Sequence, residues 1–177
     1  MLYKAKDIAD YILNYYGIRG TEINNYKLQE VLYYMQANYL VTCGTPLFEE
    51  PIIAKKFGPA VEPVYSKYRG YGGSTIPYKW IKGIKKYTEI IDEKDKKIIN
   101  LMLNLLEPYL YVPFSDLDGL TKLQAPWMEA YRLSQKDSNP ESVYIKNENL
   151  LWCFSEDNNE KILPPEENEN IETDDYI

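Results

Sequence analysis

The chain has 177 residues, of which 45% are hydrophobic, and it carries a formal net charge of −7. This length and composition suit one globular domain whose core needs neither disulfides nor metal ions. The sequence holds no histidine and two cysteines that lie far apart, Cys43 and Cys153. Without histidine, Ser-His-Asp and Cys-His catalysis and histidine-ligated zinc are excluded. The separated cysteines predict no disulfide framework and a reducing compartment.

Neither a membrane span nor a secretory signal is predicted. No apolar run reaches the roughly 18 residues that a membrane-spanning helix needs. The first seven residues already carry three charges, where a signal peptide would begin its apolar stretch. We therefore expect a soluble, cytoplasmic protein with no membrane association.

The net charge is concentrated at the C-terminus. Residues 155–177 hold nine acids and one base, giving −8, whereas the preceding 154 residues hold 18 acids and 19 bases, giving +1. With few apolar residues, this segment is predicted to be a disordered acidic tail behind a neutral body. Two interpretations stay open: a solvated tail that aids solubility, and a segment that orders against a basic partner. In the second, the apolar anchors would be Ile162, Leu163, Ile171, Tyr176 and Ile177.

Apolar periodicity predicts two helices in the first 43 residues. The first covers residues 4–16, and Gly17 is expected to end it. The second covers residues 25–43, with Asn24 or Asn25 as its cap. We expect this longer helix to be the central one, against which the others pack. Its apolar stripe is predicted to consist of Leu28, Val31, Leu32, Met35, Tyr39 and Leu40.

Proline and glycine break up the middle of the chain. A short β-hairpin is expected near residues 50–58, since Ile52 to Ala54 favour an extended backbone. A short helix is expected to start at Pro59 and end near Tyr68. Residues 84–90 are a weak candidate for a strand.

The rest of the chain predicts four more helices. They begin at Asp92, Ser115, Pro126 and Asn147. The first of them should end at Pro108. The side chains of the second expected to point inward are Leu117, Leu120 and Leu123. Together these elements predict a mainly α, compact single-domain fold over residues 1–154, followed by the acidic tail over 155–177.

Two motifs that could suggest a ligand site have simpler explanations. The glycine-rich run at residues 70–73 follows a predicted helix and lacks the lysine of a phosphate-binding loop, so we interpret it as a turn. The acids Asp92, Glu93 and Asp95 suit the start of a helix, where they favour the macrodipole, and lysines alternate with them as on a solvated face. The pI of about 4.8 argues against direct nucleic-acid binding. No cofactor, metal ion or small-molecule substrate is expected.

Four segments, taken in order, resemble a known family. They are residues 28–36, 44–61, 64–68 and 120–130. As a set they resemble the Panacea domain, the SocA-like or GepA-like family of phage and bacterial antitoxins, over about residues 3–154. The resemblance implies a mostly helical domain that neutralises a cognate toxin by direct binding, while some members deliver a toxin to a protease. The sequence departs from the family at Lys122, where histidine is usual, and at Ala60, where valine is common.

Several residues are candidates for contact with a protein partner. Tyr33 and Tyr34 lie about 100° apart on a helix, so at least one should leave the buried stripe and serve as a contact anchor. Trp127 is either a core anchor or a contact, and the turn at residues 57–59 either fixes the core or shapes a recognition surface. The full set of candidates is Tyr33, Tyr34, Glu49, Glu50, Lys56, Phe57, Gly58, Pro59, Lys122, Trp127, Glu166, Glu167, Glu169, Glu172, Asp174, Asp175 and Tyr176.

The leading hypothesis is an antitoxin that binds its toxin. A second is a phage-encoded inhibitor of a host defence enzyme, of the anti-CRISPR or anti-restriction kind, whose carboxylates imitate nucleic-acid phosphates. A third is a proteolytic adaptor. An enzyme comes last, because its site would have to be built from carboxylates, tyrosines and lysines alone.

Overall fold

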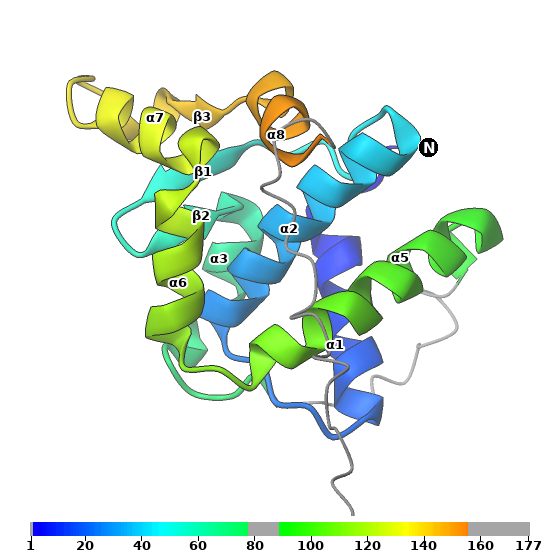
Figure 1. The fold of residues 1–177 in the computed structure, drawn as a ribbon. Helices are drawn as coiled ribbons and strands as arrows, with labels where there is room; N and C mark the ends of the chain where they lie inside the picture. The colour runs from blue at the N-terminus through cyan, green and yellow to red at the C-terminus, as the bar shows by residue number, and fades with distance from the viewer. Residues whose placement is uncertain (1, 78–88, 156–177) are drawn as a thin grey trace, which may run out of the picture.

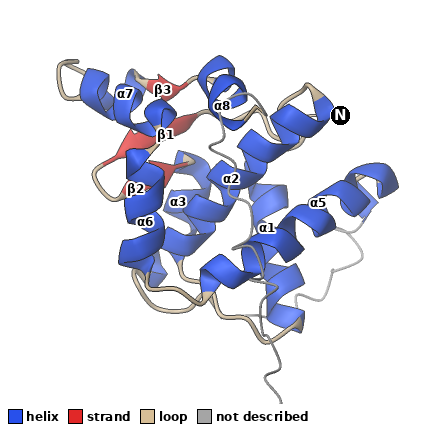
Figure 2. Cartoon of the chain, viewed as in Figure 1, coloured by secondary structure: helices blue, strands red, loops and turns tan. Residues whose placement is uncertain are grey.

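Helices dominate the computed structural model, which describes residues 2–77 and 89–155 (Figure 1). Three short strands form the sheet at one end of the described part of the chain (Figure 2). The α-helices are α1 (Ala5–Ile18), α2 (Asn25–Cys43), α3 (Glu62–Tyr68), α5 (Glu93–Leu106), α6 (Phe114–Leu123), α7 (Ala125–Ser134) and α8 (Asn147–Phe154). The strands are β1 (Ile52–Lys55), β2 (Gly58–Ala60) and β3 (Tyr144–Ile145), and the short 3-10 helices are η1 (Arg69–Tyr71), η2 (Glu107–Leu110) and η3 (Pro140–Ser142).

The central helix is α2, as the sequence predicts. It contacts α1, α3, α5, α6, α8 and β2, and Figure 1 shows it running through the middle of the fold. The predicted cap is confirmed, because the Asn24 side chain accepts a hydrogen bond from the backbone N–H of Lys27. Gly44 ends the helix in the left-handed conformation, with φ at 70°. Since neighbours surround α2, its buried residues extend around the helix well beyond the predicted stripe.

Tyrosine hydroxyls join α1 and α2 to α5. Tyr11 donates to the side-chain oxygen of Asn100 at 2.7 Å, and Tyr16 donates to the backbone oxygen of Leu103 at 2.7 Å. The buried Asp95 carboxylate accepts from Tyr3 at 2.5 Å and from Tyr39 at 2.8 Å. The sequence placed Asp95 on a solvated helix face, and this is wrong because the side chain turns inward to these two hydroxyls.

The predicted hairpin is present, and a third strand extends it. β1 pairs antiparallel with β2, with Ile53 opposite Ala60, and with β3, with Ile52 opposite Ile145. The helix expected from Pro59 begins only at Glu62, because Pro59 and Ala60 pair as β2. The strand β3 was not predicted, since two residues leave no periodic pattern.

Two local predictions in the helices are wrong. Helix α1 continues through Gly17, and the residue in the left-handed conformation is Gly20, with φ at 77°. A glycine at a helical φ does not end a helix, and the chain closes α1 instead with a bond from the N–H of Thr21 to the oxygen of Tyr16. Helix α6 begins at Phe114, so Ser115 lies inside its first turn rather than at its cap.

The inward face predicted for α6 is only partly correct. Leu117 is buried, but Leu120 and Leu123 are exposed. α6 packs on the fold through Leu117 and Thr121, which leaves its opposite face without a neighbour among the described residues. The last helix, predicted over residues 147–154, is confirmed as α8. The strand candidate at 84–90 lies almost wholly outside the described residues, as does the acidic tail.

The described helices do not include a membrane span. None of those in residues 2–77 and 89–155 combines the length and the apolar composition that crossing a bilayer requires.

We predict that Asp95→Asn lowers the free energy of unfolding at pH 7 by about 1–3 kcal/mol, because two buried hydroxyls lose an ionised acceptor. Burial alone would raise the pKa of Asp95, but the hydroxyls of Tyr3 and Tyr39 hold that pKa below its ordinary 3.8. The stabilisation is therefore present above pH 3.8 and is lost as the pH falls further.

Denaturant unfolding of both proteins at pH 7 and at pH 3 checks this prediction. Glu93→Gln, in the same first turn but exposed, is the matched control and should change little at either pH. An equal loss for the two variants at pH 7 would contradict the role given to Asp95.

Candidate functional site

A buried polar cluster lies where the β1–β2 hairpin meets helices α2 and α6. Its centre is formed by Glu30 of α2, and by Asp118 and Thr121 of α6. Gly58, the first residue of β2, lies directly over these side chains. The cluster therefore joins three elements that are far apart in the sequence.

Gly58 permits this close approach. Its φ is +100°, which side chains rarely allow, and an added Cβ would lie 2.6 Å from Glu30 Oε1 and 3.1 Å from Asp118 Oδ1. A side chain at this position would have to displace the Glu30 carboxyl group. The expectation that the turn at residues 57–59 fixes the core is thus met by Gly58 and Pro59, both of which are buried.

Glu30 is almost completely buried and only partly paired. Its Oε2 accepts from the hydroxyl of Thr121 at 2.5 Å, and Thr121 in turn lies 2.9 Å from the hydroxyl of Tyr34. Three buried side-chain atoms of the described residues lack a hydrogen-bond partner: Glu30 Oε1, Asp118 Oδ1 and Trp127 Nε1. Two of the three are thus acceptors on facing carboxyl groups.

A proton on Glu30 resolves this pairing problem. Burial, helped by the nearby charge of Asp118, raises the pKa of Glu30 from 4.5 to about 8, although the hydrogen bond from Thr121 and the charge of Lys122 oppose the shift. At neutral pH the carboxyl is therefore mostly protonated. It then carries a donor in the same small space as the unpaired Oδ1 of Asp118.

Lys122 and Trp127 cover the outer side of the cluster. Lys122 Nζ binds Asp118 Oδ2 at 2.5 Å and lies 5.8 Å from the centroid of the Trp127 ring. Trp127 is buried and its ring stacks on that of Tyr131 at 4.6 Å, as a core anchor would. Of the predicted contact residues here, Lys122 is the one that reaches the surface.

The expected exposure of Tyr33 or Tyr34 is wrong. Both are buried, with their ring centroids 5.2 Å apart and each 6.0 Å from that of Phe154 in α8. Tyr33 donates to the side-chain oxygen of Gln124 at 2.9 Å. The prediction failed because α8 covers the side of α2 that the periodic stripe left open.

Four side chains that reach the surface flank the buried cluster, two at the tip of the hairpin and two at the end of α6. We name this set the hairpin–α6 surface and define it by Lys56, Phe57, Lys122 and Leu123. Phe57 and Leu123 are 60% and 75% exposed, which is high for large apolar side chains. Lys56 lies over the ring of Phe57 at 5.7 Å. Apolar side chains beside cations suit contact with another molecule.

Glu49 and Glu50 contact the N-terminal end of α1. Glu49 forms an ion pair with Lys4, and Glu50 Oε2 accepts from the backbone N–H of Ala5 at 2.7 Å. A carboxylate on the first N–H groups of a helix stabilises that terminus. The structure therefore gives both residues a contact within the chain. The tail candidates Glu166, Glu167, Glu169, Glu172, Asp174, Asp175 and Tyr176 lie outside the described residues.

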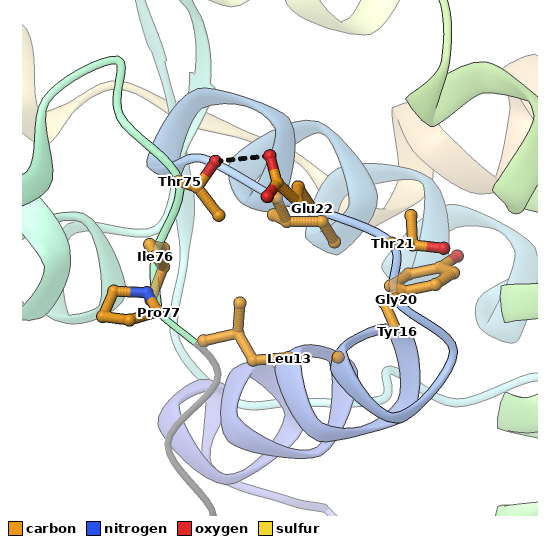
Figure 3. A pocket seen from close by; sticks show the side chains of 10 residues that line it. Leu13, Tyr16, Gly20, Thr21, Glu22, Thr75, Ile76 and Pro77 are labelled. Atoms are coloured by element: carbon orange, nitrogen blue, oxygen red, sulfur yellow. Dashed lines mark hydrogen bonds between the residues drawn. The ribbon is translucent and has the colours of Figure 1, made fainter.

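A hollow separate from the polar cluster lies between the end of α1 and the segment that follows η1 (Figure 3). Its volume is about 400 Å³, and an adjoining hollow of about 400 Å³ shares Gly20, Thr21, Glu22 and Thr75 with it. Figure 3 shows Leu13 facing Ile76 and Pro77 across the opening, with the Thr75 hydroxyl on Glu22 at its rim. None of these residues was predicted from the sequence.

The chemistry of the cluster favours a structural role. Lys122 is paired with Asp118, and Glu30 lies under the hairpin with almost no contact with solvent. The described ranges 2–77 and 89–155 hold no group of three or more acidic or cysteine side chains placed to bind a metal ion. The cluster can exchange one proton and can fix the hairpin to α6.

The sequence reasoning missed Glu30, Asp118 and Thr121. One signal was available for Glu30, since apolar residues lie three, four and seven positions after it, as on a buried helix face. Asp118 and Thr121 gave no comparable signal, because their role depends on the approach of Gly58.

Comparison with known proteins supplies one match. A family model described as Antitoxin SocA-like, Panacea domain, matches residues 28–173. The matched range takes in Glu30, Gly58, Asp118 and Lys122, and it runs past α8 into the acidic segment. No curated protein and no solved structure matches the chain.

We predict that Gly58→Ala lowers the free energy of unfolding by roughly 2–4 kcal/mol, since it strains a positive φ and displaces the Glu30 carboxyl. Denaturant unfolding measures the change. Gly73→Ala is the control, because no atom lies within 4 Å of a Cβ there. Equal stabilities for the two variants would show that Gly58 is not constrained.

The protein should also lose stability as the pH rises from about 5 to 8. The folded state holds the proton of Glu30 up to a pKa of about 8, whereas the ordinary value is 4.5. This contribution is complete below pH 4.5 and is lost as the pH rises through 8, by at most about 1.4 kcal/mol per pH unit.

The measurement is the free energy of unfolding at half-unit steps between pH 5 and pH 9. Glu30→Gln should flatten this part of the profile, because an amide does not titrate. Glu148→Gln, at an exposed position of α8, should leave the slope as in the unaltered chain. A slope that survives Glu30→Gln would assign it to another group.

Proposed function

We propose, from the premise that this chain belongs to the family of SocA-like antitoxins with a Panacea domain, that it neutralises a cognate toxin by binding it directly. The observation that carries the proposal is the family match over residues 28–173, which covers most of the chain. An antitoxin role in general follows from that membership. We further propose that the partner is a toxin, which surface of the chain binds it, and that binding blocks its activity. We place this interaction in the cytoplasm.

The hairpin–α6 surface is the contact that we assign to the toxin. Phe57 and Leu123 are 60% and 75% exposed, although their backbones are held by buried neighbours, Gly58 and Thr121. Exposed apolar side chains on a rigid support bind with little loss of conformational freedom. The nearby lysines, Lys56 and Lys122, suit a toxin surface that carries carboxylates around an apolar centre.

Binding rather than catalysis is supported by the state of the polar side chains. Lys122 is paired with Asp118, and Glu30, whose pKa is strongly raised, is sealed beneath Gly58. Glu30 therefore has no access to a substrate in this arrangement, and the amine of Lys122 is held by a carboxylate. The cluster instead holds the hairpin and α6 at a fixed separation, as a recognition surface requires.

We expect the small open reading frame next to this gene to be toxic when expressed alone and harmless when expressed with this chain. The purified products should form a complex. Growth assays with and without co-expression, followed by co-purification, give the result. A harmless neighbour, or a neighbour that stays toxic despite abundant protein, would defeat the proposal.

Variants then test the assigned surface. Leu123→Asp should weaken toxin binding about tenfold or more, because a charge replaces an apolar contact. Ile18→Asp is the matched control: Ile18 is 62% exposed at the end of α1, outside the hairpin–α6 surface. Calorimetry measures both affinities, and equal affinities would move the contact elsewhere.

The level of the toxin separates two modes of neutralisation. If the chain blocks its toxin, the toxin accumulates as an inactive complex. If the chain acts as an adaptor, the toxin disappears in cells that hold the protease and persists in cells that lack it. The second outcome would replace the blocking mode by delivery to a protease.

A further inference from the structure

An apolar groove with a basic end runs between α2 and α5. It is lined by Asn38, Thr42, Ile98, Leu101, Met102, Leu105 and Leu106, with a volume of about 180 Å³. Leu101 and Leu105 are 61% and 44% exposed, so no described residue covers this line of side chains. An exposed apolar face of this kind on a folded chain indicates a binding surface.

Two lysines mark the basic end of the groove. Lys94 and Lys97 are exposed, and in the described part of the chain no carboxylate forms an ion pair with either. Lys97, Leu101 and Leu105 are spaced four residues apart and therefore follow one side of α5. The groove thus suits a segment that combines apolar side chains with carboxylates.

The C-terminal segment has this composition and begins close to the groove. Helix α8 ends at Phe154, whose ring lies 6.0 Å from that of Tyr34 in α2. Asn38, which lines the groove, lies one helical turn after Tyr34 and donates to its backbone oxygen at 2.7 Å. The chain therefore leaves α8 about one to two turns of α2 from the groove.

Length and charge also fit. Ile162 and Leu163 follow Ser155 by seven and eight residues, a span of roughly 23–26 Å when extended. Carboxylates lie on both sides of this pair, at residues 156, 157 and 160 and at residues 166, 167 and 169. The family match does not stop at α8 but continues to residue 173, as expected if the segment is part of the domain.

We propose that residues 156–177 of this chain dock on the α2–α5 groove, with Ile162 and Leu163 on its leucines and the flanking carboxylates near Lys94 and Lys97. Attachment to α8 gives the segment a high local concentration, so a weak contact suffices. The docked segment shields Leu101 and Leu105 from water and neutralises the basic end. This docking requires no toxin.

Carbodiimide cross-linking of the full chain tests the docking, because this reagent joins carboxylates to amines in contact. Peptide mapping should find cross-links from residues 156–177 to Lys94 or Lys97 about tenfold more often than to Lys136, an exposed lysine beyond α7. This comparison needs no variant, so a folding defect cannot hide the result. Equal yields for the three lysines would overturn the proposal.

Two further arms identify the occupant. In a mixture of ¹⁵N-labelled and unlabelled chains, the two peptides of each cross-linked pair should carry the same isotope. Pairs that join a labelled to an unlabelled peptide would assign the groove to a second copy and overturn docking within the chain. Leu101→Ser should reduce the cross-links to Lys97 about tenfold, because it removes an apolar contact from the groove. Leu133→Ser, at a 40% exposed leucine of α7, should leave them unchanged, and an equal reduction would overturn the assignment.

Discussion

The approach of Gly58 to the Glu30 carboxyl group is the constraint on which the rest of the structure depends. A Cβ on Gly58 would lie 2.6 Å from Glu30 Oε1, so a larger residue there would displace the buried carboxyl group. The proton that burial retains on Glu30 lets two acidic side chains share one small space. Through Asp118, the same contact sets the position of α6. The surface that we assign to the toxin lies on the hairpin and α6, so its shape follows from a buried interaction.

Tyrosine carries much of the remaining packing. The rings of Tyr16, Tyr33 and Tyr34 are fully buried, yet each hydroxyl reaches an oxygen on α5, α6 or the α6–α7 junction. A ring adds apolar area while its hydroxyl fixes the register between helices. The abundance of tyrosine, at 18 residues, therefore has a structural explanation in the described core.

The sequence predicts what local signals determine. Helix α2 and its Asn24 and Gly44 termini, the hairpin, and the last helix all follow from periodicity, capping and turn residues. The exposure of Leu120 and Leu123 did not follow, because an apolar spacing does not say which face of α6 has a neighbour. The inward turn of Asp95 and the pairing of Glu30 with Thr121 depend on residues 56 to 92 positions away, and no local pattern records them. The sequence singled out Gly58, Lys122 and Trp127 as candidates for partner contact, which stays a prediction, and it missed the buried centre of the cluster.

Carbon-13 NMR of the glutamate side-chain carboxyl groups tests the central claim most directly, because it reports the protonation of Glu30 in the folded chain. The account predicts a Glu30 signal in the protonated range at pH 6 that titrates with a midpoint of about 8. A Glu30 signal that titrates near the ordinary 4.5 would show an ionised carboxylate under the hairpin and would contradict the account.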